Sequence, residues 1–153
     1  MPFVRSSLDK LPGGRADIDT VDSVPVGTVA IVGTLAIGSD WVAKGHRGKW
    51  SLLPAASVAS ISVVAPPGWK QVMTMGAFMA PPPDLVFATG EGVAFRIPID
   101  QVNRRARDAL LSAVGSPTRI SAVARRFLES RGLPDGWDRQ FHFVGFRFGK
   151  PYS

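Results

Sequence analysis

The sequence predicts an α+β fold: a small antiparallel β-barrel or sandwich capped by a C-terminal helix, followed by a second helix and a terminal strand. Three observations lead to this class. Apolar residues alternate with small or polar ones over several short segments, which is the period of half-buried strands. Gly90-Glu91-Gly92 separates two such segments, as in a β-hairpin. After Asp100, apolar residues recur at helical spacing.

The strands are expected before Asp100. Alternation over residues 28–37 predicts the first strand, with Val29, Ile31, Leu35 and Ile37 on one face. The other segments with strand character are 40–43, 50–53, 57–64, 85–89 and 93–97. Between segments 57–64 and 85–89 lies a stretch rich in proline and methionine, residues 66–83. It is expected either to pack as a buried strand or to adapt to a partner surface.

Two helices are predicted after the strands. Asp100 is the expected N-cap of the first helix, and Gly115 would end it. Ser116-Pro117 would begin the second helix, because proline is favoured in the first turn. A last strand is expected at 140–148.

The chain is expected to consist of three parts. Residues 1–24 contain Pro12-Gly13-Gly14 and scattered aspartates, which predicts a flexible N-terminal arm. Residues 25–115 would form the β-rich domain, and residues 116–153 a basic helix with an aromatic terminal strand.

Composition argues against several function classes. The sequence has no cysteine and two histidines, so neither a thiolate site nor a zinc centre is expected. No nucleophile elbow, P-loop or paired-histidine motif occurs, so we expect neither an enzyme nor a cofactor. No signal peptide or transmembrane segment is predicted. Thirteen arginines against five lysines indicate a GC-rich bacterial or phage genome, hence a cytoplasmic or virion-associated protein.

The net charge is concentrated in the last third of the chain. Residues 1–100 contain eight Lys/Arg and eight Asp/Glu, which cancel. Residues 101–153 contain ten Lys/Arg and four Asp/Glu, which accounts for the net charge of +6. This asymmetry predicts an anionic partner without identifying it.

Two groups of cations are candidate anion sites. The first is the glycine-containing turn Lys44-Gly45-His46-Arg47-Gly48-Lys49, whose backbone and cations could surround an anion; a solvated hairpin turn is the alternative. The second is the helical arginines, since guanidinium groups bind oxyanions in bidentate fashion. A solvated helix face is the alternative here, with Asp108 and Glu129 as local partners. The cations of the two groups are Lys44, Arg47 and Lys49 in the turn, and Arg104, Arg105, Arg107, Arg119, Arg125, Arg126 and Arg131 on the helices.

The terminal aromatic segment is a third candidate. Alternation places Arg139, Phe141, Phe143 and Arg147 on one face, an arrangement suited to base stacking with phosphate contact. The segment resembles the aromatic octapeptide of RNA-recognition motifs, although Gln140 and His142 replace small residues of that pattern. The alternatives are a strand buried on both faces and a strand that pairs with another subunit.

The order of elements resembles bacterial pleckstrin-homology-like domains over residues 25–115. The resemblance is carried by the following segments: Leu52-Leu53-Pro54-Ala55-Ala56-Ser57-Val58-Ala59-Ser60-Ile61, Leu85-Val86-Phe87-Ala88-Thr89-Gly90, Phe95-Arg96-Ile97-Pro98, and the helix after Asp100. Ala55 and Ala56 depart from the family, which often has an aromatic residue there. The resemblance implies a non-catalytic recognition domain that binds peptides, partner subunits or anionic lipid headgroups.

These observations lead to one expected function with two alternatives. We expect a non-enzymatic binding or assembly module that engages an acidic protein surface or another subunit, that is, a second copy of this chain. The main alternative is a nucleic-acid-binding protein that uses the C-terminal arginines together with Phe141 and Phe143. A peripheral interaction with an anionic membrane, through Lys44, Arg47 and Lys49, is the third possibility.

Overall fold

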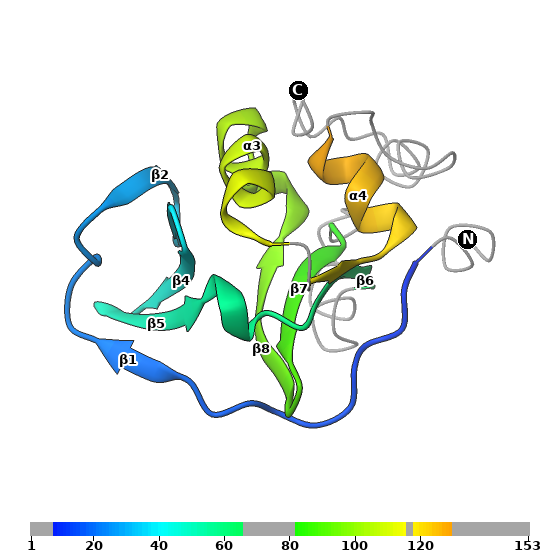
Figure 1. Ribbon diagram of the computed structural model, residues 1–153, viewed down its shortest axis with the longest axis horizontal. Helices are drawn as coiled ribbons and strands as arrows, with labels where there is room; N and C mark the ends of the chain where they lie inside the picture. The colour runs from blue at the N-terminus through cyan, green and yellow to red at the C-terminus, as the bar shows by residue number, and fades with distance from the viewer. Residues whose placement is uncertain (1–7, 66–81, 116–117, 130–153) are drawn as a thin grey trace, which may run out of the picture.

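Two β-sheets and two α-helices make up the described part of the chain, which a computed structural model defines for residues 8–65, 82–115 and 118–129 (Figure 1). This confirms the predicted α+β class. The predicted terminal strand at 140–148 and most of the proline- and methionine-rich segment lie outside the described residues.

The first sheet has five strands in the order β1-β5-β4-β3-β2, and all neighbouring strands are antiparallel. The single strand predicted over 28–37 was wrong, because the chain reverses at Gly33-Thr34, where Gly33 has a left-handed φ of 55°. Both halves of the segment are apolar, so their alternation concealed the turn. The strands are β1 (Asp19–Val21), β2 (Thr28–Val32), β3 (Leu35–Gly38), β4 (Trp41–His46) and β5 (Lys49–Pro54).

The second sheet has four strands in the order β8-β7-β6-β9. The hairpin predicted around Gly90-Glu91-Gly92 is confirmed, since β7 and β8 pair in antiparallel register there. The sheet is not wholly antiparallel, because β9 runs parallel to β6. Its strands are β6 (Ser60–Val64), β7 (Asp84–Thr89), β8 (Gly92–Pro98) and β9 (Arg119–Ile120).

The two sheets do not close into a barrel, so that part of the predicted architecture was wrong. The chain leaves β5 through the 3-10 helix Ala55–Ser57 and starts a separate sheet with β6. The outer edge of β6 is then occupied by β9 and by Asp9, which leaves no free edge there for the first sheet to join.

The N-cap of helix α3 (Arg104–Ala113) lies three residues later than predicted. Asp100 lies in the 3-10 helix Ile99–Gln101, and the N-cap is Asn103, whose Oδ1 accepts a hydrogen bond of 2.9 Å from the Ala106 amide. Helix α4 (Ala122–Leu128) is capped by Ser121 rather than by Ser116, since Arg119–Ile120 pairs first as β9.

The core lies between the sheets and beneath the two helices (Figure 1). Helix α3 packs against β2, β3, β4 and α4, while α4 packs against β6. Leu35 and Ile37 from the first sheet, Phe87 from the second and Leu110 from α3 are all fully buried. The second helix is therefore part of the same packed unit as the β-rich region.

The described residues of the predicted N-terminal arm lie along both sheets, rather than apart from them (Figure 1). Asp9 forms a bridge with Val64 of β6, and Arg15 forms a bridge with Val93 of β8. The chain then reaches the first sheet, where β1 pairs with β5. The physical reason is that these strand edges have backbone groups that need partners.

Candidate functional site

Two arginines project from the first turn of α3. Arg104 and Arg105 are both exposed, and Arg105 Nη2 donates a hydrogen bond of 3.3 Å to the carbonyl of Val29 on β2. The N-terminal end of a helix already has a positive potential, because its backbone N–H groups point outward. Cations in this turn therefore raise the positive potential instead of neutralising it, which favours contact with an anion.

Arg107 does not belong to this exposed group, although the sequence predicted it as one of the helical cations of the anion site. Its side chain is buried, at 1% exposure, and its guanidinium lies 5.1 Å from the centroid of the Phe127 ring on α4. Within the described residues, Nε and Nη2 have no hydrogen-bond acceptor. Burial lowers the pKa of Arg107; Asp108 acts in the opposite direction, and Arg104 lowers that pKa further.

The remaining helical arginines point away from the core. Arg125 and Arg126 occupy the exposed side of α4, because Ala124, Phe127 and Leu128 fill its buried side. Arg119 is exposed in β9, just before the helix.

Carboxylates neutralise little of this charge. Arg125 Nη1 lies 3.6 Å from Glu129 Oε1, and the Arg125 side chain is half exposed, so solvent screens this pair. For Arg104, Arg119 and Arg126, the described part of the chain provides no ion pair. We call the five exposed residues the arginine surface: Arg104, Arg105, Arg119, Arg125 and Arg126.

The basic turn is not assembled as the sequence analysis expected. Arg47 and Gly48 form the two-residue turn between β4 and β5, with left-handed φ values of 51° and 80°, as in a type I′ hairpin. Arg47 and Lys49 are exposed, and Lys49 Nζ lies 3.9 Å from Asp22 Oδ1. Lys44 lies inside β4 and points elsewhere, so the three cations do not surround one point.

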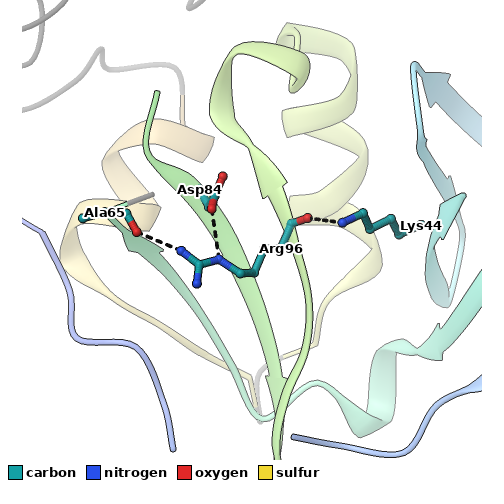
Figure 2. A network of polar contacts seen from close by, with 4 residues as sticks. All are labelled: Lys44, Ala65, Asp84 and Arg96. Carbon is teal, nitrogen blue, oxygen red and sulfur yellow. Dashed lines mark hydrogen bonds and ion pairs between the residues drawn. The ribbon is translucent and has the colours of Figure 1, made fainter. Parts of the chain in front are cut away.

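Lys44 instead links the two sheets (Figure 2). Its Nζ donates a hydrogen bond of 2.8 Å to the carbonyl of Arg96 on β8. On the other side of β8, Arg96 Nε contacts Asp84 Oδ2 at 2.9 Å, and Arg96 Nη2 donates to the carbonyl of Ala65 at 2.8 Å. Sequence reasoning missed this network. The register of the β7–β8 hairpin could have predicted part of it, because Arg96 pairs with Val86 and therefore lies diagonally opposite Asp84 on the same face.

Residues of the arm contribute to the walls of two cavities. One, of about 500 Å³, is lined by Arg15, Lys44, His46 and Phe95, among others, and none of its described lining residues is a carboxylate. The other, of about 490 Å³, is lined in part by Asp17, Asp19 and Glu91. No cluster of three or more metal-ligating side chains occurs within residues 8–65, 82–115 and 118–129. We assign neither cavity a ligand.

The other predicted site residues lie outside the described residues, so the aromatic stacking face remains a prediction. They are Arg131, Arg139, Phe141, Phe143 and Arg147. In the part of the chain that is described, no helix has the length and apolar character needed to cross a membrane.

Comparison of the chain with protein-family models, with curated proteins and with solved structures finds no match.

Proposed function

We propose that this chain is a non-enzymatic binding and assembly module whose arginine surface captures an acidic protein surface. The observation that supports this most directly is the set of five exposed guanidinium groups on α3, β9 and α4, of which only Arg125 has an ion-pair partner among the described residues. The elements that bear them are adjacent, since α3 packs on α4 and β9 leads directly into α4.

Physical chemistry favours an acidic partner for such a surface. A guanidinium presents its donors in a planar fork that matches a carboxylate, and it is more weakly hydrated than an ammonium group. Each exposed pair contributes only about 0.2–1 kcal/mol, so binding needs several arginines at once. Summed cationic charge also increases the association rate with acidic surfaces.

The scaffold of this proposal is a domain similar to pleckstrin-homology-like domains. Four sequential strands, β2 to β5, are followed by three more, β6 to β8, and then by α3. This order supports the proposal, while the unclosed sheets and the added strands β1 and β9 are departures from it. The recognition role follows from the arginine surface and not from the fold, because one fold serves many functions.

The test is binding of fluorescent poly-L-glutamate, measured by anisotropy against two variants of equal net charge. In the first variant, Arg104, Arg119 and Arg126 are replaced by glutamine. In the matched control, Arg15, Arg47 and Lys49 are replaced by glutamine, which removes the same three charges from the arm and the β4–β5 turn.

We expect the first variant to lose affinity by about 3- to 150-fold, the sum of three exposed ion pairs of about 0.2–1 kcal/mol each. The control should keep most of the affinity, because it leaves the arginine surface intact, whereas attraction by net charge alone would weaken both variants equally. Equal losses in both would contradict the proposal. Tighter binding of a duplex or single-stranded polynucleotide than of poly-L-glutamate, with a steep salt dependence, would establish the nucleic-acid alternative instead.

A further inference from the structure

Strand β2 is an edge strand with an apolar, solvent-facing side. It terminates the five-stranded sheet, and among the described strands β3 is its only neighbour. Val29 and Ile31 are 52% and 55% exposed, and Val26, just before the strand, is 99% exposed. β2 has five residues, and its register with β3 shifts between Thr28 and Ala30. An exposed apolar edge of this kind is a site at which another chain can pair.

The apolar side of β2 continues across the outer face of the sheet. Ile31 pairs with Ala36, and Ala36 with Ala43, so these residues lie on one face of the sheet. Ala36 and Ala43 are fully buried, whereas Ile31 is exposed at the edge. Trp41 belongs to that face and its ring fills the space above Gly38, while the Trp50 ring lies about 3 Å from where a side chain on Gly45 would begin. The outer face is thus uncharged and largely apolar near β2.

The other edges of the two sheets are covered or short, which protects strand edges in natural proteins from pairing with other chains. Arg119, Ser121 and Asp9 donate backbone hydrogen bonds in sequence to the carbonyls of Ala59, Ile61 and Val63 along β6. On β8, the arm pairs with Val93, and Lys44 binds the carbonyl of Arg96. The opposite edge of the first sheet is β1, which has three residues and begins with Asp19.

We propose that β2 is a self-association edge, at which a second copy of this chain adds its own β2 in antiparallel orientation. The strand Thr28–Val32 contains no charged residue, so two chains of net charge +6 can meet there without like charges in the ladder. One strand supplies both the open edge and the apolar side chains, which is the self-complementarity that a two-fold interface needs.

The backbone of β2 has one described side-chain contact that competes with pairing. Arg105 Nη2 donates to the Val29 carbonyl at 3.3 Å, and the Arg105 side chain is exposed. A hydrogen bond of that length to a solvated side chain is readily exchanged for a backbone hydrogen bond. This inference extends the assembly part of the proposed function and is independent of acid capture by the arginine surface.

Sedimentation velocity and light scattering of the full chain test the proposal. The wild-type chain should form a dimer as its concentration rises toward about 1 mM, the weak end of specific association. Ile31→Lys should shift the equilibrium to the monomer, because it places a charge at the edge. Thr20→Lys on β1 adds the same charge at the opposite edge and should leave the dimer intact. A wild-type chain that stays monomeric, or an Ile31→Lys variant that still dimerises, would overturn the proposal.

A distance measurement identifies the interface without altering it. The sequence has no cysteine, so Thr20→Cys provides a single site for a nitroxide label. Pairing through β2 creates a ten-stranded sheet with β1 at both ends, and nine inter-strand steps place the two labels roughly 40 Å apart, less any loss to sheet twist. A dimer whose labels lie within a few strand spacings of each other would instead show that β1 forms the interface. Poly-L-glutamate binding by Ile31→Lys separates the two proposals, since it should match that of the wild type.

Discussion

Ser121 Oγ donates a hydrogen bond of 2.5 Å to Asp9 Oδ2, which joins two residues 112 positions apart in the chain. The same Asp9 oxygen accepts from the Val63 amide at 2.9 Å, and the Asp9 amide donates to the Val63 carbonyl. Ser121 is also the N-cap of α4 and accepts from the Ala124 amide at 3.1 Å. This pair therefore connects the N-terminal arm, the edge of β6 and the start of α4.

We predict that Asp9→Ala destabilises the fold by about 1.5–3 kcal/mol, since it removes a charged acceptor from the Ser121 hydroxyl and the Val63 amide. Urea denaturation measures the change. Asp17→Ala is the control, because Asp17 is exposed on the same arm, and its stability should match the wild type. An Asp9→Ala variant as stable as the Asp17→Ala variant would contradict the structural role of this contact.

Arg107 should reduce the stability of the free protein. At neutral pH its guanidinium is charged in both the folded and the unfolded chain. Burial lowers the pKa of Arg107 in the folded chain, so keeping its guanidinium charged there reduces the free energy of unfolding. This loss of stability disappears only as the pH rises through the lowered pKa. Arg107→Met keeps an unbranched side chain against Phe127 and removes the charge, so it should stabilise the fold by on the order of 1 kcal/mol.

Thermal unfolding at neutral pH measures the effect of Arg107→Met. Arg104→Met, on the exposed side of the same helix, should change the melting temperature little. A lower melting temperature for Arg107→Met would contradict this prediction, because it would mean that favourable contacts of the guanidinium outweigh the cost of burying its charge.

Gly38→Ala should destabilise the first sheet by about 1–3 kcal/mol, because the added methyl group would collide with the Trp41 ring. Gly90→Ala is the control, since nothing lies within 4 Å of its added carbon. Equilibrium denaturation of both variants provides the comparison. Equal stabilities would show that Trp41 does not cover Gly38.

Lys44→Met should lower stability by about 1 kcal/mol, through loss of the hydrogen bond to the Arg96 carbonyl, and leave poly-L-glutamate binding unchanged. Lys49→Met, at an exposed position, should alter neither property appreciably. If Lys44→Met instead weakened binding at unchanged stability, the basic turn would have to be included in the binding site.

The sequence predicted those elements whose signal is local. The β7–β8 hairpin followed from Gly90-Glu91-Gly92, and the apolar stripe of α4 followed from helical spacing. The turn at Gly33 was missed because apolar residues continue on both sides of it. The N-cap was misplaced because Asp100 and Asn103 are both favoured capping residues, and only Asn103 adjoins the helix.

Contacts between distant segments could not be predicted in this way. The contacts of Asp9 with Ser121 and of Lys44 with Arg96 depend on how the two sheets are placed. Arg107 had a local signal that was overlooked: it precedes Leu110 by three residues and Val114 by seven, which is the spacing of one buried helix face. Its charge favours the solvent-exposed side of a helix, but its position places it on the buried face.

The central claim is that the exposed arginines of α3, β9 and α4 contact an acidic partner, and arginine side-chain NMR tests it most directly. In a ¹⁵N-labelled wild-type chain, adding poly-L-glutamate should shift the Nε–Hε signals of Arg104, Arg119 and Arg126. The signals of the buried Arg107 and of Arg96, which is held by Asp84, should stay in place. Shifts confined to Arg15 and Arg47, or no shifts at all, would contradict the account.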